Sequence, residues 1–238
     1  MKYISLNSLV PAGLLVLGMA VSTSCASTYK NSTGLKEVDG LVSRVDRVHV
    51  EGELSLVAVR DSVTAMLELV APQGTTTVHE AFAAFEKTIA VSVDQHDAFK
   101  DSVAQLQTDA TPFFEGWSEG LQSFSSQRIR VQSRKRMEET RMTYDRIVLS
   151  SETPLSRYTE FNNSLQDVAL FLSRDFNSSS VRMIDAELRS LIQIAGDLDE
   201  DFAKCLDSCK GYSEASGLPV RVQIEETHPQ GSSGSEQR

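Results

Sequence analysis

The longest apolar pattern in this 238-residue chain runs from Phe82 to Phe124 without losing its register. Its members recur every three or four residues: Phe82, Phe85, Ile89, Ser92, His96, Phe99, Val103, Leu106, Ala110, Phe113, Trp117, Gly120 and Phe124. This spacing places one side chain per turn on a single helix face, as in the seam of a coiled coil. The pattern therefore predicts a long helix that buries one stripe against other helices.

Local signals give this helix a start and two disturbances. Thr77 and Glu80 form the pattern of a capping box, so the helix should begin there. Pro112 lies inside the pattern, and because the register continues past it, a kink is expected rather than a reversal. The helix is predicted to reach Ser150, and Glu152–Pro154 should be the next joint.

Helical spacing also fills the rest of the central chain. A first helix should begin at Leu35 and be weak near residues 49–53, where polar residues and Gly52 interrupt the pattern. The polar residues 177–180 predict a tight turn of an antiparallel hairpin, and a final helix should end near Gly211. The fold class predicted is all-α: elongated antiparallel helical hairpins in a coiled-coil-like bundle with one long central helix, over residues 35–212.

The N-terminus resembles a bacterial export signal. Lys2 precedes an apolar run, Leu9–Val21, which as a helix would be about 20 Å long and so shorter than a bilayer core. Thr23 and Ser24 precede Cys25 as in a lipobox, although Ser22 stands where Leu is usual. We expect a signal peptide at 1–24, a lipid on Cys25 and a Ser/Thr-rich tether at 25–34. Cleavage after Ala26, without a lipid, is the alternative.

The net charge of the chain limits the classes of partner that it can bind. The formal net charge of −10 argues against nucleic acid, which needs a concentrated basic face. The basic residues gather in one segment: Arg128, Arg130, Arg134, Lys135, Arg136, Arg141 and Arg146. The first five could contact an anionic surface such as lipid headgroups. Alternatively, the segment is a solvated face paired with its own acidic residues or with those at 196–201.

Cys205 and Cys209 lie one helical turn apart on the last apolar seam. They could pack in the core or form a local disulfide, which would strain an intact helix. Zinc needs four ligands, and no third cysteine or histidine is close in sequence. His49, His79, His96 and His228 form no metal motif, and no nucleophile elbow or phosphate loop is present. We therefore expect neither a cofactor nor an enzyme.

Two long stretches carry a family resemblance. They are "FFEGWSEGLQSFSSQRIRVQSRKRMEETRMTYDR" and "TPLSRYTEFNNSLQDVALFLSRDFNSSSVRMIDAELRSL". With them, residues from Val38 to Cys209 resemble the bacterial envelope proteins collected as domain of unknown function 2959. The resemblance implies export, often with a lipobox, and a helical fold, but no activity. The segment "FLSRDFNSS" departs from the Lys-His-Asn hairpin usual in that family.

These observations together predict a non-enzymatic lipoprotein of the cell envelope, anchored to a membrane through Cys25 and facing the periplasm. Its helices would act as a spacer or dock a protein partner, including a second copy of the chain. The alternatives are a carrier or sensor that holds an apolar or anionic ligand between helices, and a soluble periplasmic or secreted protein. Residues 213–238 are expected to form a disordered tail.

Overall fold

The structure is a computed structural model that describes residues 36–71 and 77–216. Within these residues the chain forms helices and no strand. The elements are α1 (Lys36–Val70), α2 (Val78–Gly120), the short 3-10 helix η2 (Leu121–Ser123), α3 (Gln127–Arg174), α4 (Ser178–Met183) and α5 (Asp185–Ser216). The predicted all-α class is confirmed.

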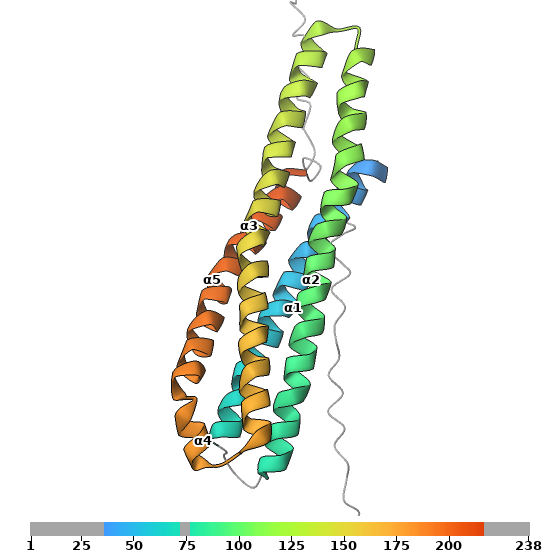
Figure 1. Cartoon of the computed structure of the whole chain (residues 1–238). Helices are drawn as coiled ribbons and strands as arrows, with labels where there is room; N and C mark the ends of the chain where they lie inside the picture. Colours follow the sequence, from blue (N-terminus) through green and yellow to red (C-terminus); the bar gives the residue numbers. More distant parts are fainter. Residues whose placement is uncertain (1–35, 72–76, 217–238) are drawn as a thin grey trace, which may run out of the picture.

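The four long helices form an up-down-up-down bundle (Figure 1). α1 packs against α2 and α5, and α3 packs against the same two helices from the other side. Each long helix thus has two antiparallel neighbours, the arrangement that short connections favour. None of the described helices combines the length and apolarity needed to cross a membrane.

Several predictions fall on residues at the two ends of the chain. The signal segment, Cys25 and the tether lie outside the described residues, as do residues 217–238 of the predicted tail. The first four residues of that tail, 213–216, are helical and complete α5. The helix continues past Gly211 because Cys209 and Tyr212 on either side of it are buried in the core.

The apolar pattern predicted a central helix that continues to Ser150, but the structure divides this segment into two helices. α2 passes through Pro112 and ends at Gly120, and the chain reverses between residues 121 and 126. Pro112 is exposed, so the carbonyl group left free one turn earlier can bond to water. Ser126 caps the next helix by accepting a hydrogen bond from the Ile129 amide. The apolar spacing continued across the reversal because Leu121 and Phe124 still turn toward the helices.

The predicted joint at Glu152–Pro154 is also wrong, because α3 runs through Pro154. Proline inside a helix costs a hydrogen bond and about 3 kcal/mol. Pro154 itself is buried, and Ile147 and Tyr158 on either side of it are fully buried. Burial of each such side chain stabilises by ~1.5–3 kcal/mol, which together outweighs the cost of the proline.

The predicted weak point of α1 is instead a close contact between helices. Gly52 lies so near α5 that an added Cβ would stand 3.0 Å from Leu206 Cδ2 and 3.6 Å from Phe202 Cδ1. Glu51 beside it is buried but paired: Arg47 Nη2 lies 2.5 Å from one carboxylate oxygen, and Gln95 Nε2 donates to the other at 2.7 Å. α1 therefore continues through these polar residues, because other side chains pair with the buried carboxylate of Glu51.

The predicted local signals at the other helix ends are confirmed. Thr77 and Glu80 form the complete capping box of α2. Asn177 caps α4 by accepting from the amides of Ser179 and Ser180, and the chain reverses there into α5. Both signals act within one helical turn, which is why the sequence alone located them.

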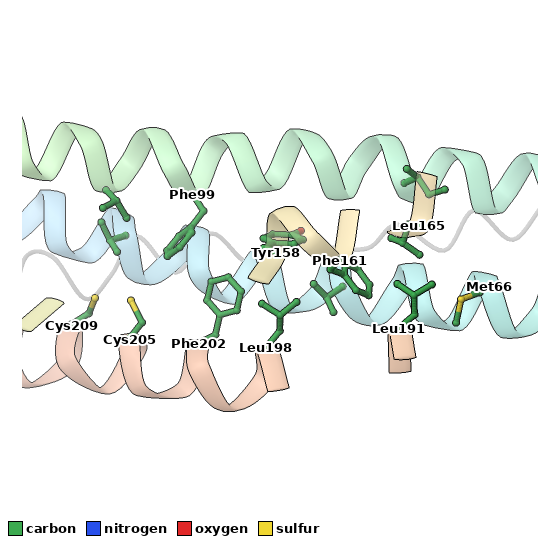
Figure 2. Packing of buried hydrophobic residues seen from close by; sticks show 14 of the residues in the cluster. Met66, Phe99, Tyr158, Phe161, Leu165, Leu191, Leu198, Phe202, Cys205 and Cys209 are labelled. Atoms are coloured by element: carbon green, nitrogen blue, oxygen red, sulfur yellow. The ribbon is translucent and has the colours of Figure 1, made fainter. Parts of the chain in front are cut away.

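The core is one continuous apolar cluster shared by all four long helices. Aromatic rings fill its middle (Figure 2): Phe99 of α2 meets Phe202 of α5 edge-on at 5.0 Å between centroids, and Tyr158 of α3 meets Phe202 at 6.1 Å. The predicted seams supply these residues. Edge-on ring pairs add to the free energy of burial and fix the relative rotation of the helices.

Candidate functional site

The end of α2 and the start of α3 project beyond the other two long helices (Figure 1). Arg44 near the start of α1 pairs with Asp109 at 2.6 Å, and Arg136 Nη2 donates to the carbonyl of Ala215 at the end of α5 at 2.7 Å. Beyond these two contacts, residues 113–136 form a two-helix hairpin, which we call the prong. A projecting hairpin exposes more of each helix than a bundle does, so it is the natural candidate for an interaction site.

An aromatic cluster holds the prong together. Phe113 contacts Phe114 at 5.1 Å and Trp117 at 5.7 Å between centroids, and Phe114 contacts Tyr144 of α3 at 5.6 Å. The Trp117 indole N–H donates to Ser133 Oγ at 3.0 Å across the two helices. These rings therefore belong to the core of the prong.

The five predicted basic residues all lie on the prong, in two groups. Arg130 and Arg136 bind the protein itself: Arg130 Nη2 donates to the carbonyl of Phe124 at 2.5 Å, and Arg136 holds the end of α5. Lys135 lies 3.8 Å from Glu139, a weak exposed pair. In the part of the chain that the structure describes, the exposed side chains of Arg128 and Arg134 form no ion pair.

The acidic segment 196–201 does not neutralise these residues. Asp199 pairs with Arg60 at 2.9 Å, and Asp201 lies 2.7 Å from Arg157 Nη1 and 3.2 Å from Lys204 Nζ. The charged side chains of the prong are two acidic and five basic: Glu115, Glu119, Arg128, Arg130, Arg134, Lys135 and Arg136. A basic prong on a chain of formal net charge −10 creates a strong charge asymmetry along the molecule.

Exposed apolar side chains extend along the outer face of α3 from the prong toward the bundle. Val131 is 55%, Met142 61% and Leu149 65% exposed. No sequence motif gave these residues a role. Their spacing of eleven and seven residues, which keeps them on one helix face, was the available signal.

Comparison with known proteins places the whole bundle in one family. Residues 28–213 match the family described as protein of unknown function (DUF2959). The chain belongs to this family. The matched range includes residues of every described helix, so the prong is part of the DUF2959 domain rather than an addition to it. No curated protein and no solved structure matches the chain.

Cys205 and Cys209 of the DUF2959 bundle are free thiols, and both point into the core (Figure 2). Each is at most 1% exposed. The hydrogen bond to Cys205, followed by burial, raises the pKa of the Cys209 thiol. The protonated Cys209 thiol is therefore a poor nucleophile, and the burial of both side chains means that the pair packs in the core in the reduced state. An oxidised form stays a prediction.

A polar connection joins α2 and α3 inside the DUF2959 core. Ser92 Oγ lies 2.7 Å from Asn162 Oδ1 and 3.2 Å from the Tyr158 hydroxyl, and all three residues are buried. Since Ser92 has one hydroxyl proton, it donates to Asn162 while Tyr158 donates to Ser92. Burial raises the pKa of Tyr158 to about 12. His96 lies at the margin of this group, edge-on to Tyr158 at 5.3 Å.

Two open grooves lie at the end of the DUF2959 bundle opposite the prong. One, of about 440 Å³, runs between α3, α4 and α5, and the other, of about 540 Å³, between α2 and α3. The charged residues that line them are all acidic: Asp167 and Glu187 in the first, Glu86 and Asp94 in the second. An anionic ligand would therefore meet like charge in either groove.

No group of three or more potential metal ligands comes together among the residues that the structure describes. His49 lies 3.7 Å from Glu53 on its own helix, and His96 contacts the neighbouring Asp97 and Thr159 of α3. The functional feature best defined by geometry is thus the prong, together with the outer face of α3.

Proposed function

We propose that this DUF2959 chain is a non-enzymatic lipoprotein of the cell envelope. Its bundle serves as a rigid spacer, and its prong docks against another surface. The observation that carries this proposal is the projection of a basic two-helix hairpin beyond both α1 and α5. A filled apolar core behind the prong supports a mechanical role, because it holds the prong in one orientation.

The direction of α1 links the anchor to the prong. α1 begins at the end of the bundle from which the prong projects (Figure 1). A lipid on Cys25 would join this end through the tether 25–34, and ten residues reach at most ~35 Å when extended. Under this proposal the prong lies near the membrane that holds the lipid, where its basic residues meet anionic headgroups.

Mass spectrometry of the mature N-terminus tests the anchor. The proposal expects a chain that begins at Cys25 with the mass of a diacylglycerol group and a further acyl chain, recovered with membranes. Several acyl chains hold a protein far better than one, so Cys25→Ser should release the chain into the soluble fraction. An unmodified chain that begins after Ala26 would contradict lipidation and support the secreted alternative.

Vesicle binding tests the prong separately. The Cys25→Ser chain, which carries no lipid, should bind vesicles containing phosphatidylglycerol more strongly than vesicles of phosphatidylcholine alone, and less at high salt. Arg128→Glu combined with Arg134→Glu should abolish this preference without lowering the melting temperature. Lys100→Glu, an exposed charge of α2 outside the prong, is the matched control. If the Arg128→Glu/Arg134→Glu variant and the Lys100→Glu control bind anionic vesicles equally well, the prong does not contact lipid.

The groove between α3, α4 and α5 supports a second candidate, a carrier of an apolar ligand. Its lining includes Phe171 and Met183, which are 37% and 69% exposed. If the groove binds ligands, Phe171→Ser with Met183→Ser should weaken binding of the apolar dye Nile red at least about tenfold. Ile192→Ser, on an exposed position of α5 outside the groove, should have no effect. Unchanged dye binding in the groove variant would exclude this role.

A further inference from the structure

The outer face of α3 carries a stripe of exposed residues that is complementary to itself. The stripe consists of Arg128, Val131, Lys135, Glu138, Met142, Asp145 and Leu149. Their alternating spacing of three and four residues puts them on one helix face, and all of them are exposed. The stripe begins on the prong and continues onto the bundle, and residues 128–149 span about 33 Å of helix.

Placed antiparallel to a second copy of itself, the first six residues of the stripe pair apolar with apolar and charge with opposite charge. With a two-fold axis between Arg136 and Met137, Arg128 lies opposite Asp145 of the second copy. Val131 then lies opposite Met142, and Lys135 opposite Glu138, each pair occurring twice. We propose that two copies of this chain associate through this stripe in that register. This inference rests on the docking role proposed for the prong and specifies its partner.

The charges on the stripe are available for such pairing. Arg128, Glu138 and Asp145 form no ion pair or hydrogen bond with other described residues, and Lys135 has only the 3.8 Å contact with Glu139. Exposed apolar residues in a row with unpaired charges of both signs are typical of a helix face that contacts another helix.

Other arrangements of the same stripe are less favourable. A parallel pair would place Arg128 against Arg128 and Lys135 against Lys135, and directly opposed like charges repel. An antiparallel pair shifted by one heptad brings Val131 opposite Leu149 but places Glu138 against Met142. That shift removes a carboxylate from water without a partner. The register centred between Arg136 and Met137 avoids both penalties.

The expected dimer is elongated and weak. A contact between two single helix faces of this length is at the lower end of specific interfaces, so association should depend on protein concentration. Exposed charge pairs set the register, so association should also fall as salt rises. The two bundles would point away from each other, and the α3 part of each prong would lie along the part of α3 that follows the prong in the other copy.

A charge swap tests the register directly. In analytical ultracentrifugation of the Cys25→Ser chain at low salt, Lys135→Glu and Glu138→Lys should each weaken self-association about tenfold, because each change opposes like charges at two places. The double variant Lys135→Glu/Glu138→Lys recreates both pairs and should restore association. Lys100→Glu is the control for charge alone. Melting curves of all variants should coincide, since the altered side chains are exposed.

The outcomes separate the possible partners. A chain that stays monomeric at all concentrations, or a double variant that associates no better than the single ones, overturns the dimer. Normal association of Glu138→Lys would favour the register shifted by one heptad and overturn the one proposed.

Glu138→Lys should also bind anionic vesicles better, since it adds a positive charge to the prong side of α3. If the dimer fails while vesicle binding depends on Arg128 and Arg134, the docking function stands with lipid as the partner. If both fail, the proposed function fails as well.

Discussion

Ser92 illustrates how single polar residues shape this core. The spacing of the sequence placed Ser92 on the seam of α2 among large apolar residues, and the structure gives it two polar partners on α3. Asn162 also donates to the Ser92 carbonyl at 3.4 Å. Buried polar groups are tolerated only when they are hydrogen-bonded, so these residues fix the register between α2 and α3.

Replacing Ser92 by alanine should therefore cost more than the loss of one hydroxyl group. The variant would leave Asn162 Oδ1 and the Tyr158 hydroxyl buried without the Ser92 hydroxyl, while Asn162 keeps its bond to the carbonyl of residue 92. We expect a loss of about 1–3 kcal/mol in the free energy of unfolding. Urea denaturation measures this change. Ser208→Ala is the control, because Ser208 is close to the surface and bonds only to its own helix at the Lys204 carbonyl. Equal effects of the two variants would contradict the role of the buried contact.

The buried tyrosines predict the behaviour of the protein in alkali. Burial raises the pKa of both Tyr158 and Tyr212 to about 12, from the ordinary value of 10.0. The fold thus favours the neutral phenol, and this contribution is complete below pH 10 and is lost as the pH rises from 10 to 12. Each tyrosine should account for roughly 3 kcal/mol of stability over that range.

Absorbance near 295 nm checks this expectation, because it follows phenolate formation. The titration should include a late component near pH 12 that coincides with loss of helical circular dichroism. Tyr158→Phe removes the ionisable group and should reduce the pH dependence of unfolding between 10 and 12. Complete phenolate formation near pH 10 in the folded protein would contradict the burial of these residues.

At the level of the helix, α1 shows two glycines with opposite consequences. A methyl group added at Gly40 would have no atom within 4 Å, whereas one added at Gly52 would meet Leu206, Phe202 and Phe99. Glycine weakens a helix interior by about 0.5–1 kcal/mol relative to alanine. At Gly40, where space is open, nothing compensates for this cost. At Gly52, the missing side chain permits close packing of α1 against α5.

Substitutions at Gly40 and Gly52 test helix packing, because they should change stability in opposite directions. Gly40→Ala should stabilise the protein by up to about 1 kcal/mol, because only helix propensity changes. Gly52→Val should destabilise it by about 1–3 kcal/mol or more, because the branched side chain forces α1 and α5 apart. Thermal unfolding of the two variants measures both signs. Stabilisation by Gly52→Val would show that α1 and α5 are not in close contact there.

For the whole molecule, the prong and the bundle should differ in local stability. Each long helix has two neighbours in the bundle, whereas in the prong α2 and α3 pack against each other and η2, and Arg136 at its base also bonds to α5. Fewer buried contacts allow local opening at lower free energy. Amides of residues 113–136 should therefore exchange with deuterium faster than those of residues 85–106, although α2 contributes to both ranges. Equal protection would indicate that something covers the prong in solution, as the proposed dimer would at high concentration.

The sequence by itself determined that the chain is helical and which residues form the seams. It also located two helix starts, at the capping box of Thr77 and at the polar turn of Asn177. These features depend on neighbours within one or two turns, so local spacing is enough to identify them. The same reasoning located the basic segment, but not that it forms a projecting hairpin with the aromatic residues around Trp117.

Only the tertiary structure decided where the helices break and which faces stay open. Pro154 lies inside α3 and residues 121–126 form the reversal, because burial against other helices, and not local propensity, sets the free energy at each point. Glu51 and Gly52 continue α1 because Gln95 and Leu206 come from other helices to meet them. The open face of α3 arises in the same way: at the prong α1 and α5 end before they reach it, and along the bundle it faces away from the buried side of α3 at Ile147. The lengths and packing of several helices together determine both.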